Sequence, residues 1–187
     1  MHDPQRRIVR LRTIAGHVRG VQRMERDDAY CIDLIKQVQA IQAALDKFAG
    51  LVLEHHLATC VTETIRSEDE AERERVVTEL VQVYAPLGEG GPHGELFALS
   101  RLDRLQKVES DVQQIEQLVT GDAYCIDIIQ RAQQAKAALE RFNARVLSDH
   151  LNGCITDAIR GDQVAEREHK LRELLQLFTT ANTLQAS

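Results

Sequence analysis

The chain has 187 residues, of which 43% are hydrophobic and 28% charged, and its formal net charge is −6 at pH 7. These values are ordinary for a globular protein and argue against a uniformly basic nucleic-acid binder, although they allow a local basic face. No apolar run approaches the roughly 18 residues that span a bilayer, and no secretory leader is evident, so we expect a cytoplasmic protein without membrane contact. In a reducing cytosol the four cysteines favour metal-binding, redox or buried roles over disulfides.

The first half of the chain predicts three helices. Proline occurs only at positions 4, 86 and 92, and strand-like alternation is not evident, which favours an all-α fold. Apolar residues spaced by three and four predict a helix over about residues 5–26, which Asp27 and Asp28 end. A long second helix is expected from about residue 31 to residue 66, and a short third helix from about residue 70 to residue 83.

The second half of the chain repeats the first at an offset of 94 residues. The pentapeptide Ala-Tyr-Cys-Ile-Asp at residues 29–33 recurs at 123–127, and Cys60 recurs as Cys154. This register indicates a tandem duplication. We therefore expect helices at about 98–120, 125–160 and 164–181. The predicted organisation is a first unit at residues 1–84, a Gly/Pro-rich linker at 85–97 and a second unit at 98–187.

The length of the second helix suggests how the two units pack. A helix of about 35 residues is some 50 Å long and cannot bury its apolar stripe alone. Two such helices packed antiparallel, with the first helices beside them, make a four-helix bundle. We therefore expect an all-α fold in which two three-helix units form an antiparallel four-helix bundle with two short C-terminal helices, as a fused pseudo-dimer.

Each long helix carries a cysteine, a histidine and a second cysteine, separated by 25 and by four residues. Twenty-five residues are close to seven turns, so the three side chains share one face, but the first cysteine lies about 37 Å from the other two. Only an antiparallel partner helix can bring it to a histidine and a cysteine. The spacing therefore predicts two crossed clusters, namely Cys31 with His150 and Cys154, and Cys125 with His56 and Cys60.

Two thiolates and one imidazole form a three-coordinate soft donor set, which favours Cu(I) over hard cations. Zn(II) prefers four ligands and would need a water molecule or another side chain. Two other interpretations stay open. The cysteines could be buried apolar residues beside ordinary histidines, or the opposed cysteines could form disulfide or persulfide pairs.

The sequence resembles the CsoR/RcnR/FrmR family of small all-helical bacterial repressors, once per unit. The resemblance rests on the following segments: Arg10-Leu11-Arg12, Gly16-His17-Val18-Arg19-Gly20, Tyr30-Cys31, and His56 with Cys60. The cysteine and histidine spacing looks like that of the copper-sensing branch, which implies Cu(I) held by a cysteine of one subunit and a histidine and cysteine of the other. The nickel- and cobalt-sensing branch of the family also resembles the chain, so Ni(II) stays an alternative beside Zn(II). That branch, however, uses more histidine ligands.

The resemblance implies further residues around the metal and a mode of action. A tyrosine before the first cysteine and a glutamate linked to the histidine surround the family's metal ligands; the matching residues are Tyr30, Tyr124, Glu79 and Glu173. The family binds operator DNA as a tetramer of three-helix subunits and releases the DNA when metal binds. One chain resembles a fused dimer, so a homodimer of this chain would be equivalent to the family tetramer.

The first helices of the two units differ in charge. Residues 5–26 carry seven arginines against one acid, Glu25, whereas residues 99–120 carry three basic and four acidic residues. The basic helix could neutralise several phosphates, although an arginine-rich helix can also be a solvated surface. The resemblance implies DNA contacts at Arg10 and Lys47, and the basic helix of the first unit adds Arg12, Arg19 and Arg23 as expected contacts. The matching Arg104 and Arg141 of the second unit lie in a less basic setting.

These observations together predict a cytoplasmic Cu(I)-responsive DNA-binding repressor whose operator binding is released by metal. The open alternatives are a copper-binding buffer or adaptor without DNA activity, and a thiol or persulfide sensor. We find no Gly-rich phosphate loop and no Ser-His-Asp order in a strand context, so an enzyme is not expected.

Overall fold

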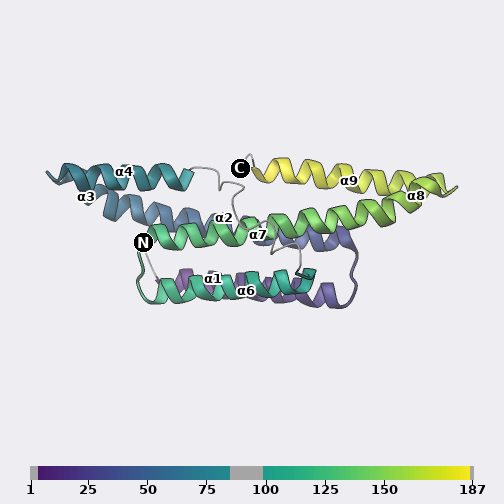
Figure 1. Ribbon diagram of the computed structural model, residues 1–187, viewed down its shortest axis with the longest axis horizontal. Helices are drawn as coiled ribbons and strands as arrows, with labels where there is room; N and C mark the ends of the chain where they lie inside the picture. Colours follow the sequence, from purple (N-terminus) through teal and green to yellow (C-terminus); the bar gives the residue numbers. More distant parts are fainter. Residues whose placement is uncertain (1–3, 85–98, 186–187) are drawn as a thin grey trace.

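A computed structural model describes residues 4–84 and 99–185, and all regular structure in these two ranges is helical (Figure 1). The first unit consists of α1 (Pro4–Arg26), α2 (Cys31–His56), the π-helical turn η1 (Leu57–Val61), α3 (Thr62–Arg66) and α4 (Glu70–Tyr84). The second unit consists of α6 (Arg101–Thr120), α7 (Cys125–His150), the π-helical turn η2 (Leu151–Ile155), α8 (Thr156–Arg160) and α9 (Val164–Gln185). The predicted linker at 85–97 lies outside the described residues.

The all-α prediction is confirmed, and most of the predicted boundaries agree with the structure to within a few residues. Two local differences stand out. The long second helix of each unit continues to residue 66 or 160 as expected, but a π-helical turn interrupts its regular hydrogen bonding. The last helix, α9, continues to Gln185 rather than ending near residue 181, since neither glycine nor proline follows Gly161 to stop it.

Four helices form the bundle in two layers. The helices α2 and α7 pack against each other in one layer, and α1 and α6 pack against each other in the other (Figure 1). Each first helix also packs on the long helix of its own unit. The core between the layers contains the fully buried side chains of Phe48 and Phe142, which occupy equivalent positions in α2 and α7, surrounded by leucine, isoleucine and valine. Burying each such side chain stabilises the fold by about 1.5–3 kcal/mol.

The first helix of each unit ends in the same way, which sets the start of the long helix. Asp28 and Asp122 adopt left-handed backbone conformations, with φ of 52° and 51°. The amide of Ala29 donates to the carbonyl of Met24 and that of Ala123 to the carbonyl of Leu118, each at 2.9 Å, which is the hydrogen bond of a Schellman motif. The chain therefore reverses within a few residues, and the cysteine that follows becomes the first residue of the long helix.

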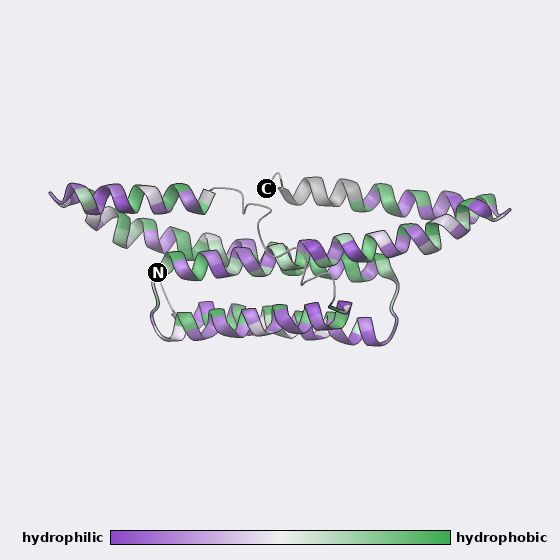
Figure 2. Ribbon diagram, viewed as in Figure 1, coloured by the Kyte–Doolittle hydropathy of each residue, from purple (hydrophilic) through white to green (hydrophobic). Residues whose placement is uncertain are grey.

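The helices α4 and α9 fold back along the outer side of the long helices, at opposite ends of the molecule (Figure 1). Their inner sides bury Val76 and Val83 in α4 and Leu177 in α9. Their outer sides mix apolar and polar residues (Figure 2). None of the helices in the described part of the chain is long and apolar enough to cross a membrane.

Candidate metal centre

The antiparallel register of α2 and α7 brings the two halves of each predicted cluster together. Near the middle of the pair, Asn143 Nδ2 donates to Gln42 Oε1 at 3.4 Å, and Lys136 Nζ lies 2.9 Å from Asp46 Oδ2. The same register places the first residue of each long helix beside the π-helical turn of the other. Burial raises the pKa of Cys31 and of Cys125, and the opposed Cys154 and Cys60 add to this rise, so the opposed cysteines are close enough to interact electrostatically.

Each cluster contains a histidine whose ring nitrogens make no hydrogen bond. His56 is 0% exposed and His150 is 1% exposed, and both nitrogens of each ring lack a partner. Leaving a buried polar group unsatisfied costs about 1–3 kcal/mol, so such atoms call for a functional explanation. Burial lowers the pKa of both histidines, which keeps the imidazoles neutral and their lone pairs available to a metal ion.

The first cysteine of each long helix is partly or fully buried, and this burial favours the protonated thiol. Burial is the main cause that raises the pKa of Cys31 and of Cys125. A nearby guanidinium opposes this rise in both clusters, from Arg101 at Cys31 and from Arg7 at Cys125. Cys154, by contrast, is exposed. An ion from solvent can therefore reach the Cys31 cluster at Cys154, and its binding would displace thiol protons.

A π-helical turn follows the histidine and contains the second cysteine of each cluster. The turn η1 follows His56 and contains Cys60, and η2 follows His150 and contains Cys154. A threonine closes each turn, because the hydroxyls of Thr62 and Thr156 donate to the carbonyls five residues earlier at 2.7 and 2.8 Å. Single π turns inside α-helices occur frequently at functional sites. A regular helix was expected here, and the π-helical turns are a difference that the structure reveals.

A tyrosine and a glutamate surround each histidine, but not in the expected order of contacts. The rings of Tyr30 and His150 meet edge to face with centroids 5.7 Å apart, and those of Tyr124 and His56 at 5.5 Å. Each tyrosine hydroxyl then donates to a glutamate at 2.6 Å, Tyr30 to Glu173 and Tyr124 to Glu79. The resemblance implied a glutamate linked to the histidine. In the structure each glutamate accepts a hydrogen bond from the tyrosine hydroxyl and not from the histidine. The glutamate still acts on the histidine electrostatically: burial lowers the pKa of His56 and His150, and Glu79 and Glu173 oppose that lowering.

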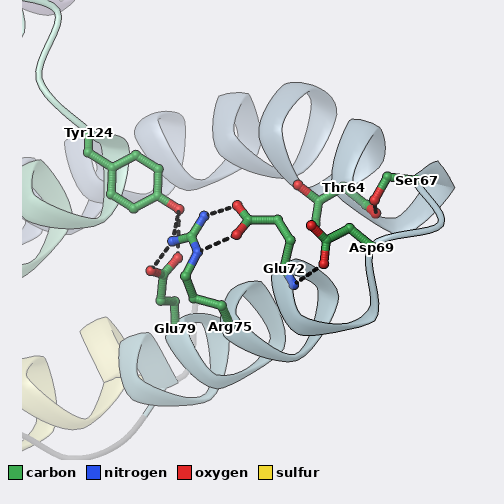
Figure 3. Close-up of polar contacts among 7 residues, drawn as sticks. All are labelled: Thr64, Ser67, Asp69, Glu72, Arg75, Glu79 and Tyr124. Carbon is green, nitrogen blue, oxygen red and sulfur yellow. Dashed lines mark hydrogen bonds and ion pairs between the residues drawn. The ribbon is translucent and has the colours of Figure 1, made fainter.

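A cation that was not expected from the sequence joins each tyrosine–glutamate pair. Arg75 bonds Glu79 and Glu72 and lies 5.7 Å from the Tyr124 ring centroid (Figure 3). In the other cluster Lys170 bonds the Tyr30 hydroxyl, with its Nζ 4.3 Å from the ring centroid. The two cations occupy non-equivalent positions of the repeat, so comparing the units could not reveal them.

The donor set of each cluster fits a soft metal ion. Within residues 4–84 and 99–185, no group of three His, Cys, Asp or Glu side chains converges closely enough to hold a metal ion as it stands. Each cluster nevertheless combines two neighbouring thiols with a buried, neutral and unpartnered imidazole. Sulfur and nitrogen donors of this kind suit Cu(I) and, with a fourth ligand, Zn(II).

Comparison with known proteins identifies the family. The family model described as "Metal-sensitive transcriptional repressor" matches the chain twice, at residues 3–85 and at residues 100–180. The chain belongs to this family. The metal-sensitive repressors are transcription regulators and not enzymes, which agrees with the sequence prediction, and the two matches agree with the tandem repeat.

Several members of the metal-sensitive repressor family are similar in sequence. The copper-sensing transcriptional repressor CsoR of Bacillus subtilis (strain 168) is 41% identical over 75 residues, which cover 40% of this chain and 71% of that protein. The repressor of the same name from Mycobacterium tuberculosis (strain ATCC 25618 / H37Rv) is 41% identical over 56 residues, 30% of this chain and 47% of that protein. The copper-sensing transcriptional repressor RicR of that strain is 45% identical over 56 residues, 30% of this chain and 58% of that protein. No solved structure gives a significant match.

The residues expected to contact DNA lie on the surface of this family member, as a repressor would require. Arg10, Arg12, Arg19 and Arg23 are exposed along α1, and Lys47 is exposed on α2. Two of the arginines are engaged within the chain, because Arg12 Nε lies 2.8 Å from Glu116 Oε1 and Arg19 Nη1 lies 3.0 Å from Glu109 Oε1. Both glutamates belong to α6 of the second unit.

Proposed function

We propose that this chain is a cytoplasmic Cu(I)-responsive repressor, which binds operator DNA through the basic face of α1 and releases it when Cu(I) binds the crossed clusters. The observation that carries the proposal is the pair of buried histidines with unpartnered ring nitrogens, each beside thiols contributed by both units. A structural histidine in a core would be expected to bond at least one neighbour.

The choice of copper depends on the donors near each histidine. Two thiols and one imidazole satisfy a three-coordinate soft ion, whereas Zn(II) requires a fourth ligand. The carboxylates that act on the two histidines, Glu79 and Glu173, are each bonded to a tyrosine hydroxyl and a cation. The copper-sensing names of the similar repressors support the same choice. Zn(II) and Ni(II) are the alternatives.

Metal binding could affect DNA binding because each cluster takes its ligands from both units. Each cluster draws its first cysteine from one unit and its histidine and second cysteine from the other, so closing a cluster acts on both α2 and α7. The helices α1 and α6 pack on these two helices and would shift with them. Cu(I) would release DNA to the extent that it binds the shifted arrangement more tightly than the DNA-bound one.

A measurement of DNA affinity with and without Cu(I) tests the proposal. The probe is a duplex carrying the region upstream of the protein's own gene, and the readout is fluorescence anisotropy. We expect the metal-free protein to bind and Cu(I) to weaken binding roughly 10- to 100-fold, within the usual range of allosteric coupling. The double variant Cys31→Ser with Cys125→Ser should bind DNA and ignore Cu(I). Equal affinity with and without bound Cu(I) would refute the proposal.

A second candidate function uses the same cysteines as a thiol sensor. It is favoured by the proximity of the opposed cysteines and the exposure of Cys154. With peroxide as oxidant, Cys31 and Cys154 would form one disulfide, and the two thiol protons would leave in water as the peroxide is reduced. Release of DNA by peroxide but not by Cu(I) would select this function. Tight Cu(I) binding with no DNA affinity would instead select a copper buffer or adaptor.

A further inference from the structure

The contact between α1 and α6 pairs arginines of the first unit with glutamates of the second. The two helices run antiparallel, so Arg12 near the start of α1 meets Glu116 near the end of α6, at 2.8 Å. Arg19 meets Glu109 at 3.0 Å, and the amide of the buried Gln22 also donates to Glu109, at 2.8 Å. Both glutamates are therefore held in place from the α1 side.

The exposure of these side chains shows which partner faces solvent. The Arg12 and Arg19 side chains are 69% and 49% exposed, whereas those of Glu116 and Glu109 are 25% and 18% exposed. Exposed ion pairs of this kind contribute only about 0–1 kcal/mol to stability, so they are not needed to hold the bundle together. A polyanion such as DNA could reach both guanidinium groups, but the paired glutamates already neutralise part of their charge.

Comparing the two repeats shows that neither the two glutamates nor the two arginines are repeated in the other unit. The positions equivalent to Glu109 and Glu116 in the first unit are Ala15 and Gln22, and those equivalent to Arg12 and Arg19 in the second unit are Gln106 and Gln113. Glu109 and Glu116 thus have no acidic equivalent in the first unit, and both contact arginines of α1. A third ion pair between the two helices has the opposite sense, because Glu25 of α1 lies 2.6 Å from Arg101 of α6. The other two acids of α6 have partners within their own unit, Asp103 at the Ser100 cap and Asp111 at Lys107 and Arg131. A general loss of basic charge from α6 would produce neutral residues, as at Gln106 and Gln113, and does not account for the two acids that lie opposite arginines of α1.

We propose that Glu109 and Glu116 form an internal acidic counter-surface, which competes with DNA phosphates for Arg19 and Arg12 and keeps the DNA affinity of the chain low. No ion pair engages Arg10 or Arg23 in the described part of the chain, so these arginines would meet DNA first. Binding that also recruits Arg12 and Arg19 must displace the two glutamates. This inference rests on the proposed DNA binding and adds residues of the second unit that limit it.

The test compares two double variants of the full chain with the same change in charge. Glu109→Gln with Glu116→Gln removes the counter-surface. Glu74→Gln with Glu168→Gln is the control, because these exposed acids occupy equivalent positions on α4 and α9, on the far side of the molecule from α1 and α6 (Figure 1). Binding to a duplex of arbitrary sequence is measured over a salt series, so that no operator needs to be known, and thermal melts verify folding.

We expect the Glu109 and Glu116 variant to bind the duplex roughly 10-fold more tightly, with a salt dependence steeper by about 0.9 per released arginine. The single variant Glu116→Gln should give an intermediate affinity, and the control should stay within about twofold of the wild type.

Equal tightening of DNA binding in both double variants would show an effect of net charge alone and overturn the inference. Salt-dependent binding that is the same in wild type and the Glu109 and Glu116 variant would also overturn it, while leaving the proposed function intact. If none of the proteins binds the duplex in a salt-dependent way, the proposed function is wrong and the inference fails with it.

Discussion

The two buried histidines, His56 and His150, provide the main evidence for the candidate metal site. Their positions could be predicted from the sequence, because the Cys–His–Cys spacing recurs and only an antiparallel partner can complete each set. Their surroundings could not be predicted as well. The glutamates lie close enough to the histidines to interact with them electrostatically, but their hydrogen bonds are with the tyrosine hydroxyls. Arg75 and Lys170 were missed, because side-chain contacts between helices leave no periodic signal in either helix alone.

The buried histidines predict how the stability of the metal-free protein depends on pH. Burial lowers the pKa of His56 and His150 in the folded state, whereas in the unfolded chain a histidine accepts a proton near pH 6.5. Their contribution to the free energy of unfolding is therefore complete above about pH 6.5 and is lost as the pH falls below it.

Urea unfolding of the metal-free protein at pH 7.5 and at pH 5.5 tests this. We expect lower stability at the lower pH and a smaller decrease in the double variant His56→Gln with His150→Gln. A decrease of the same size in wild type and variant would show that other groups cause it.

The helices themselves were predictable because their starts and ends have local chemical signals. Asp27 and Asp28 end the first helix as expected, and Ser100 begins α6 with a capping box, in which its hydroxyl accepts the amide of Asp103 and the Asp103 carboxylate accepts the amide of Ser100. The π-helical turns could not be predicted, because one widened turn barely changes the spacing of apolar residues along a long helix. Their placement beside both second cysteines is a result that only the structure provides.

The capping box at α6 makes a stability prediction. Ser100→Ala removes the side-chain acceptor of the Asp103 amide and should lower the free energy of unfolding by about 1 kcal/mol. For a chain of this size, that change lowers Tm by about 2–4 °C. Calorimetry measures it. Ser110→Ala, at an exposed position in the middle of the same helix, is the matched control and should not lower Tm, because alanine is the better helix former. Equal losses in the two variants would contradict a specific role for the cap.

At the scale of the whole molecule, the duplication places a pseudo-dimer in one chain. The sequence could predict this arrangement because neither long helix can bury its stripe alone. It could not indicate that α6 neutralises part of α1, since that depends on which positions of the two helices meet. The outer sides of α4 and α9 also carry exposed apolar residues at equivalent positions, Val77 and Val81 in one helix and Leu171 and Leu175 in the other. We propose that a second copy of the chain covers them, as the resemblance to a tetrameric family implies.

The proposed homodimer can be tested at these positions. Val81 and Leu175 are 64% and 65% exposed in the single chain, so replacing both with glutamate should not disturb the fold but would place charges in an apolar interface. Light scattering after size-exclusion chromatography should show two chains for the wild type and one for the variant. The variant should keep its helical circular dichroism spectrum. A wild type that is monomeric at micromolar concentration would contradict the proposal.

Titration with Cu(I) against a competing chelator tests the crossed clusters most directly, using two double variants that remove the same number of thiols. Cys31→Ala with Cys154→Ala affects both units but only one proposed cluster, so one of two Cu(I) ions per chain should be lost. Cys31→Ala with Cys60→Ala affects a single unit but both proposed clusters, so both ions should be lost. The reverse pattern, with one ion retained by the Cys31 and Cys60 variant and none by the Cys31 and Cys154 variant, would contradict the account.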